Sequence, residues 1–127
     1  MTNRIINNGD WFIVEIIEKY EPVSSDKNQK LRRVTTWGNY HLIHADTPSK
    51  AYDKAVEIGK NSNYKFINSD KIKMKSEFLG IGDMILIHEN LEDGAEIMWN
   101  DYGFISAKRS DKIAKTKKEL MNRLKVK

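Results

Sequence analysis

The feature that most constrains the fold is a run of β-branched and aromatic residues near the N-terminus. Residues 11–20 read WFIVEIIEKY, a composition that favours a β-strand. The first part of this run is apolar at successive positions, so both faces of the strand must be covered. Such a strand is typical of the middle of a sheet. We therefore expect residues 11–20 to form a central strand.

A second strand is expected next to the first one. Residues 21–30 are polar and contain Pro22, which indicates a loop. Residues 31–45 then predict a long strand that is bent or bulged at Gly38. The connection favours an antiparallel hairpin with a loose tip.

A helix is expected after this hairpin. Thr47 can accept hydrogen bonds from the first free amides of the helix, and Pro48 suits the first helical position because it has no N–H to satisfy. Ala51, Ala55 and Ile58 recur at helical spacing and predict one apolar stripe. Polar residues 61–63 end the helix.

Three further strands and a last helix complete the expected pattern. Residues 71–78 alternate between apolar and charged side chains, which predicts a half-buried strand whose basic outer face carries Lys71, Lys73 and Lys75. A break or bulge is expected at residues 80–82. Two more strands are expected over residues 84–88 and 95–105, joined through an Asp93-Gly94 turn, before a helix over residues 111–125.

The predicted fold class is α+β, with a mainly antiparallel sheet in the order ββαβββα and helices packed on one face. The 127 residues fit one compact domain. We expect a flexible N-terminus over residues 1–10, a single domain over residues 11–107, and a basic C-terminal helix within residues 108–127 that is docked on the domain or extends from it.

Charge is unevenly distributed along the chain. The net charge is +4, but residues 108–127 carry nine basic and two acidic residues, whereas residues 1–107 carry a net charge of −3. Residues 89–96 form an acidic turn with four acids in eight residues. The molecule is therefore expected to have separate acidic and basic surfaces.

Several protein classes are excluded by what the sequence lacks. It has no cysteine, which excludes disulfides, thiolate metal sites and cysteine nucleophiles. No apolar run approaches the roughly 20 residues of a membrane span. The first residues do not resemble a signal peptide, so we expect a cytoplasmic protein that does not associate with membranes.

No set of residues predicts catalysis, a metal site or a cofactor. His41 and His44 point to opposite faces of a strand, and Gly80-Ile81-Gly82 is a lone glycine pair without a following helix. No nucleophile motif is present. Glu15 lies within an apolar strand, where we expect it to face solvent or to pair with Arg32 or Arg33.

The aromatic residues have two interpretations. The three tryptophans are most simply residues of the core and its edge. Alternatively, an exposed sheet face could use aromatic side chains as a base-stacking platform, with the candidates Trp11, Trp37, Trp99, Tyr40 and Phe78.

The chain also resembles a small bacterial family, domain of unknown function 4288, over about residues 11–99. The resemblance is carried by Trp11-Phe12, Ala45-Asp46, the helix face with Ala51 and Ala55, and the segments at residues 78–83 and 91–96. This family implies no activity and no catalytic residues. The segment after Trp99 lies outside the pattern.

These features favour a non-enzymatic protein-interaction domain of a bacterial accessory system, for example a toxin-neutralising immunity protein that covers its partner with a charge-complementary surface. The candidate partner-binding residues belong to the acidic turn or to the basic helix: Glu89, Glu92, Asp93, Glu96, Lys112, Lys115, Lys117, Lys118 and Arg123. The oligomeric state does not follow from the sequence.

The alternative is a nucleic-acid-binding protein. It would use the basic C-terminal helix together with the lysine-rich strand face over residues 71–75. Its binding to DNA or RNA would depend steeply on salt concentration.

Overall fold

A computed structural model describes residues 9–125 of the chain. The predicted N-terminal segment 1–10 therefore falls mostly outside the described residues, as do residues 126–127 at the end of the basic segment. Within the described part, the element order is ββαββαα. The fold is a mixed α and β structure, as expected, but its order differs from the predicted ββαβββα.

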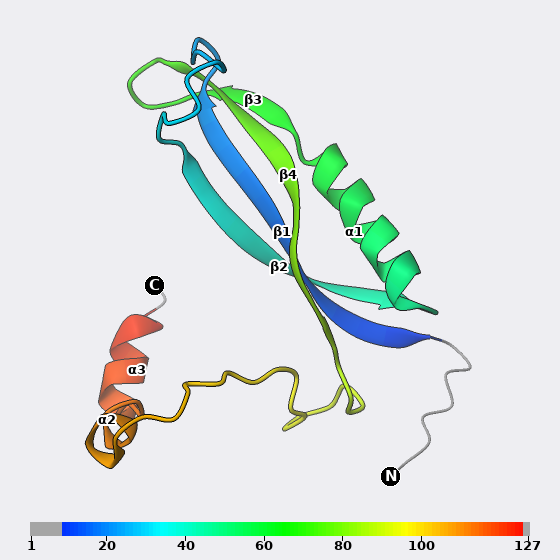
Figure 1. Ribbon diagram of the computed structural model, residues 1–127, viewed down its shortest axis with the longest axis vertical. Coiled ribbons are helices and arrows are strands. Elements are labelled where there is room, and N and C mark those ends of the chain that lie inside the picture. The colour runs from blue at the N-terminus through cyan, green and yellow to red at the C-terminus, as the bar shows by residue number, and fades with distance from the viewer. Residues whose placement is uncertain (1–8, 126–127) are drawn as a thin grey trace.

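Four antiparallel strands form one twisted sheet in the order β2-β1-β4-β3 (Figure 1). The strands are β1 (Asp10–Pro22), β2 (Thr35–Ala45), β3 (Tyr64–Ile67) and β4 (Lys73–Leu86). β1 pairs with β2 on one side and with β4 on the other along almost its whole length. The prediction that residues 11–20 form a central strand is confirmed.

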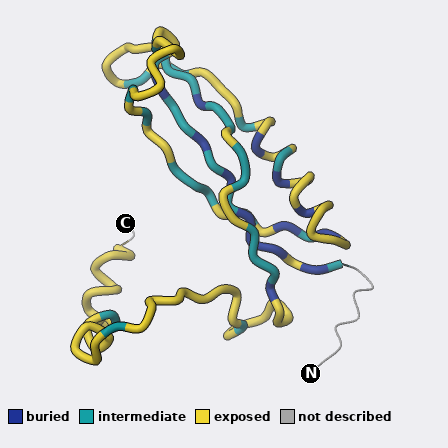
Figure 2. The backbone as a smooth tube through the Cα atoms, viewed as in Figure 1, coloured by how far each residue is buried: buried dark blue, intermediate teal, exposed yellow. Residues whose placement is uncertain are grey.

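The core lies between β1 and the single long helix. Phe12, Val14 and Ile16 on one face of β1 are buried together with Ile43 and two helix alanines. The opposite face of β1 carries Ile13, which is also buried. Both faces of the strand are therefore covered near its N-terminal end, which explains the unbroken apolar run in the sequence. Figure 2 shows this concentration of buried residues along β1.

Helix α1 (Pro48–Asn61) covers one face of the sheet (Figure 1). The Thr47 side chain accepts a hydrogen bond from the amide of Lys50 at 3.1 Å, and Pro48 occupies the first turn, as predicted. The opposite face of the sheet is called the open face below. It carries alternate residues of β1, namely Ile13, Glu15, Ile17, Lys19 and Glu21.

The apolar stripe of α1 differs from the prediction at its last position. Ala51 and Ala55 are buried as expected, but the third buried residue is Gly59, whereas Ile58 is exposed. A Cβ atom at Gly59 would overlap the ring of Phe78 on β4. Small residues at every fourth position let the helix backbone lie close to the sheet, and the large side chains that fill the core come from the strands.

The second strand is shorter and more regular than predicted. Residues 31–34 belong to the loop, so β2 begins at Thr35. The register between β1 and β2 is continuous, and the bulge predicted at Gly38 is absent from this pairing. Gly38 instead lies against the side chain of Glu15 on β1. A Cβ atom at position 38 would overlap the carboxyl group of Glu15.

The two strands predicted over residues 71–78 and 84–88 are one continuous strand, β4. The glycine-containing segment between them bulges without ending the strand. The register against β1 shifts twice, leaving Gly82 and Leu79 without a pairing partner on β1. The short strand β3 was not predicted, because four residues carry too little periodicity to be recognised.

The prediction of a strand over residues 95–105 is wrong. This segment has no ladder partner among the described residues. Local hydrogen bonds favour turns instead: the amide of Gly103 donates to the side chain of Asp101 at 2.7 Å, and Gly103 has a φ of +82°. A backbone amide that donates to a nearby side chain is no longer available to pair with another strand.

Two short helices replace the single helix predicted over residues 111–125. They are α2 (Ala107–Asp111), which Ser106 caps, and α3 (Lys117–Arg123), which starts at a capping box between Thr116 and Glu119. The second cap restarts the helix, which explains the interruption. Neither helix has a buried residue, and both lie away from the sheet (Figure 1). The expectation that the helices pack on one face holds for α1 alone.

The outer edge of the sheet beside α1 carries one side-chain contact. The ammonium group of Lys54 on α1 donates a hydrogen bond to the backbone carbonyl of His44 on β2 at 2.5 Å. This contact ties the helix to the edge strand and uses one of the carbonyl groups that point away from the sheet.

We predict that Gly59→Ala lowers the free energy of unfolding, by about 1–2 kcal/mol, because overpacking against Phe78 outweighs the gain in helix propensity of about 1 kcal/mol. The exposed neighbouring variant Lys60→Ala serves as the control. Urea unfolding followed by circular dichroism measures both. A Gly59→Ala protein more stable than the wild type would show that the helix does not need this close approach.

Candidate functional site

The acidic turn lies where the chain leaves the sheet. After β4 the amide of the buried Ile87 donates to the carbonyl of Trp11 at 3.0 Å, which fixes the exit point of the chain. The chain then reverses through a turn closed by a hydrogen bond from the amide of Ala95 to the carbonyl of Glu92. Gly94 has a φ of +90° in this turn, a conformation that favours glycine.

The reversal brings residues 96–99 back beside the end of β4, and the two segments enclose a cavity of about 350 Å³. We call this cavity the acidic groove. Its charged or polar lining consists of Asp83, His88, Glu89 and Glu96, and its apolar lining consists of Met84, Ile85, Leu86, Ile97, Met98 and Trp99. No lysine or arginine lines it. The groove thus combines carboxylates with apolar side chains.

The structure separates the four predicted acidic residues into two pairs. Glu89 and Glu96 line the acidic groove, whereas Glu92 and Asp93 lie at the exposed turn and do not line it. Asp83 was missed by the sequence interpretation, because it comes before the acidic turn in the sequence. The reversal of the chain that places it beside the turn could not be predicted from the acids alone.

Trp99 corrects the interpretation of the tryptophans as residues of the core and its edge. Its side chain is 73% exposed, whereas Trp11 packs against His44 and Trp37 packs against Tyr20. The proposed aromatic platform is also not gathered on one face. Trp37 and Phe78 lie on the helix side of the sheet, whereas Trp11 and Tyr40 lie on the open face.

The predicted basic residues lie in a different part of the chain. Lys112 lines a cavity of about 290 Å³ together with Tyr102, Ile105, Arg109 and Ile113. The other four, Lys115, Lys117, Lys118 and Arg123, are exposed and line none of the cavities described here. The exposed character of the whole segment after β4 is visible in Figure 2.

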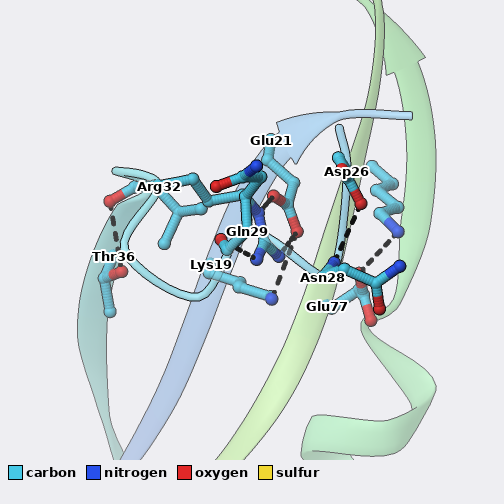
Figure 3. A network of polar contacts seen from close by, with 10 residues as sticks. Lys19, Glu21, Asp26, Asn28, Gln29, Arg32, Thr36 and Glu77 are labelled. Atoms are coloured by element: carbon cyan, nitrogen blue, oxygen red, sulfur yellow. Dashed lines mark hydrogen bonds and ion pairs between the residues drawn. The ribbon is translucent and has the colours of Figure 1, made fainter. Parts of the chain in front are cut away.

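A second polar cluster lies at the other end of the sheet, around the loop between β1 and β2 (Figure 3). Glu21 is only 2% exposed and accepts two hydrogen bonds from Arg32, at 2.7 and 2.9 Å. Lys19 makes an ion pair with the same carboxylate at 3.1 Å. Arg32 also donates to the carbonyl of Gln29, so this buried carboxylate organises the loop.

The surroundings of Glu21 change its titration. The Arg32 hydrogen bonds lower the pKa of Glu21 from the ordinary value of 4.5 to about 2, with a further contribution from Lys19, although burial acts in the opposite direction. The hydrogen bond and ion pair with Lys75, at 3.0 Å, likewise lower the pKa of Glu77.

Of the two alternatives for Glu15, pairing with Arg32 or Arg33 is wrong, and the side chain is partly exposed. Arg32 is bound to Glu21, and Glu15 makes no hydrogen bond or ion pair within residues 9–125. Its carboxyl group lies between Gly38 and Gly82 on the flanking strands, where side chains larger than hydrogen would overlap it. It is half-buried on the open face beside Tyr40 and Asp83, and these three groups supply one exposed polar row.

Within residues 9–125, no three His, Asp or Glu side chains gather in a way that could hold a metal ion. This includes the acidic groove. None of the helices in the same part of the chain is both long and apolar enough to span a membrane.

Comparison with known proteins identifies one family. The family model described as Domain of unknown function (DUF4288) matches residues 11–99. The match includes the sheet, α1 and the acidic groove, and it ends before α2. No curated protein and no solved structure matches the chain significantly.

We predict that Arg32→Met lowers the free energy of unfolding by about 2–3 kcal/mol, because it leaves the buried Glu21 without its bidentate partner. Arg33→Met is the matched control, since Arg33 is exposed and one residue away. Urea denaturation at neutral pH compares the two variants. Equal stability of both would contradict a structural role for the Glu21–Arg32 pair.

The same carboxylate predicts a pH dependence. Glu21 binds a proton near pH 4.5 in the unfolded chain but only near pH 2 in the folded protein. Its contribution to stability is therefore complete above about pH 4.5 and is lost as the pH falls toward 2. Thermal unfolding between these pH values should show a smaller pH dependence for Glu21→Gln than for the wild type. If the melting temperature of Glu21→Gln depends on pH as steeply as that of the wild type, Glu21 does not cause the pH dependence.

Proposed function

The chain belongs to the DUF4288 family, and on that premise we propose that it is a non-enzymatic protein-interaction domain. Its binding surface is the acidic groove with the neighbouring turn, and its partner is a protein with a basic surface. The observation that carries this proposal is the combination of three carboxylates with the exposed side chains of Ile97, Met98 and Trp99 in one cavity.

Charge complementarity argues for a basic partner. Residues 76–107 contain seven acidic residues and no lysine or arginine. Of these acids, Glu77 is neutralised by Lys75, while the acids of the groove and the turn have no ion pair within the described residues. Such a surface attracts a cationic partner, increases its association rate and disfavours acidic competitors.

The apolar side chains of the groove supply the binding energy that charge alone lacks. Interfaces are anchored by aromatic and apolar side chains at the centre of a contact, with charged groups around them. Trp99 fits this role because it is large and mostly exposed in the free protein. Covering it would remove apolar surface from water, at roughly 25 cal/mol per Å².

A toxin-neutralising immunity protein of a bacterial accessory system is one concrete form of this function. A toxin that acts on nucleic acid must present lysine and arginine side chains to phosphate groups. An acidic groove with an apolar anchor would cover such a surface and block access to it. This form of the proposal requires no catalytic group in the chain.

We predict that the double variant Glu89→Lys/Glu96→Lys binds the partner at least tenfold more weakly than the wild type, because both charges face the groove. The control is Asp53→Lys/Asp70→Lys, which makes the same charge change at exposed positions outside it. The tagged full-length protein captures candidates, which are identified by mass spectrometry. The captured protein is then purified, and calorimetry measures its affinity for each variant.

A second variant tests the apolar anchor. Trp99→Ala should weaken binding of the same purified partner by at least tenfold, without changing the fold as measured by circular dichroism. If both groove variants bind as tightly as the Asp53→Lys/Asp70→Lys control, the acidic groove is not the interface.

The nucleic-acid alternative makes a different prediction. Replacing Lys112, Lys115, Lys117, Lys118 and Arg123 with glutamine should abolish retention of the protein on a DNA or heparin column at low salt. Retention that is lost in this variant but not in Glu89→Lys/Glu96→Lys supports the alternative. No retention of the wild type at about 50 mM salt excludes it, because screening is weak at this ionic strength.

A further inference from the structure

A second cavity, far along the sheet from the acidic groove, has the opposite charge. It has a volume of about 530 Å³ and lies around β4 where β3 and the β1–β2 loop approach it. We call it the lysine pocket. Its lining consists of Val23, Lys27, Asn63, Tyr64, Lys65, Lys75, Ser76 and Glu77. Three lysines and one glutamate give this lining a net charge of +2.

The three lysines come from three segments of the chain, namely the β1–β2 loop, β3 and β4. Lys65 on β3 and Lys75 on β4 are direct cross-strand partners, so two like charges stand opposite each other on the open face. Like charges in this arrangement are destabilising unless a counter-charge lies between them. Glu77 pairs with Lys75 at 3.0 Å and supplies one such charge, but neither Lys27 nor Lys65 makes an ion pair within residues 9–125.

The third lysine, Lys27, comes from the β1–β2 loop and adds a further positive charge to the pocket. The ammonium groups of Lys27 and Lys75 are direct neighbours, and this contact lowers the pKa of Lys27. Lys75 is mostly buried, with only 12% of its side chain exposed, so water screens its charge less than it would at the surface. An anion bound there would remove the repulsion between Lys27 and Lys75, and Lys65 lines the same pocket.

The loop that carries Lys27 is held in place. The amide of Val23 donates to the carbonyl of Lys73 at 2.9 Å, which attaches the loop to β4. Asp26 accepts a hydrogen bond from the amide of Asn28 at 2.9 Å, and Arg32 fixes the far end of the loop on Glu21 (Figure 3). A site whose cationic groups are fixed in advance loses less entropy when it binds a ligand.

Uncharged polar groups complete the lining. Asn63 accepts a hydrogen bond from the amide of Phe78 through its side-chain oxygen at 2.6 Å, which leaves its NH₂ group as a donor. Tyr64 and Ser76 are cross-strand partners one position away from the Lys65–Lys75 pair, so their side chains lie on the helix side of the sheet, opposite to the two lysines.

We propose that the lysine pocket binds a small phosphorylated molecule, with its phosphate among Lys27, Lys65 and Lys75. Lysine is a common phosphate ligand, and a phosphate dianion matches the net charge of +2. The volume lies within the range of about 300–1,000 Å³ that is typical of small-molecule sites. A polynucleotide is not favoured, because the carboxylate of Glu77 lines the pocket beside the lysines and limits the basic surface to this one site.

The test measures binding of inorganic pyrophosphate and of ribose 5-phosphate to the full-length protein by calorimetry. We expect wild-type binding at low salt and at least tenfold weaker binding for Lys27→Gln/Lys65→Gln. The control Lys30→Gln/Lys60→Gln removes the same charge from exposed lysines outside the pocket and should bind within about twofold of the wild type.

Three outcomes would overturn the proposal. The first is the absence of binding by the wild type at about 10 mM pyrophosphate, a concentration that detects even millimolar sites. The second is an equal loss of affinity in the pocket and control variants, which would indicate general charge attraction. The third is an affinity for single-stranded oligonucleotides that exceeds that for pyrophosphate and rises with their length. The groove variant Glu89→Lys/Glu96→Lys should bind pyrophosphate normally, so the result is independent of the proposed protein partner.

Discussion

The rest of the structure depends on the hydrogen bonding of β1 to strands on both of its sides. β2 and β4 pair with it along almost their whole lengths, so the positions of the candidate residues Lys75 and Asp83 are set by their register against β1. The apolar half of β1 binds α1 on one face, while its charged half places Lys19 and Glu21 on the open face. One strand therefore contains both the hydrophobic core and the buried carboxylate that organises the β1–β2 loop. The two cavities with opposite charge lie near its two ends, because β4 runs antiparallel to it and carries Lys75 at one end and Asp83 at the other.

Sequence patterns predicted the parts of the fold that depend on local regularity. The apolar run of β1, the Thr47-Pro48 start of α1 and the glycine bulge in β4 were all predicted, because each has a direct backbone cause. The strand over residues 95–105 and the long C-terminal helix were not, because local hydrogen bonds from Asp101 and Thr116 favoured a turn and a new helix start. The candidate residues Glu89 and Glu96 belong to an acidic cluster that is visible in the sequence, and both line the acidic groove. The contribution of Asp83 and the convergence of Lys27, Lys65 and Lys75 require knowledge of which distant segments meet, and no periodicity carries that knowledge.

The distribution of charge has a physical consequence for binding. Opposite charges on one small protein would attract each other if the chain allowed them to meet, yet the acidic groove lies near one end of β4 and the lysine pocket near the other. Each surface therefore keeps its charge available for a ligand. The ion pairs that Lys19 and Arg32 make with Glu21 stabilise the β1–β2 loop. They do not neutralise the acidic groove, which lies elsewhere on the sheet. This separation favours two independent binding events over one.

The contact between Lys54 and the carbonyl of His44 bears on self-association of the sheet. Among the described strands β2 forms one edge of the sheet, and an edge of eleven residues is a template on which another chain can add a strand. A lysine ammonium bound to an outward carbonyl blocks one position of that template and places a positive charge where an incoming strand would have to lie. At the other edge, β3 is only four residues long and offers little length for such an addition. Protection from amyloid-like aggregation is thus built into the same helix that covers the core.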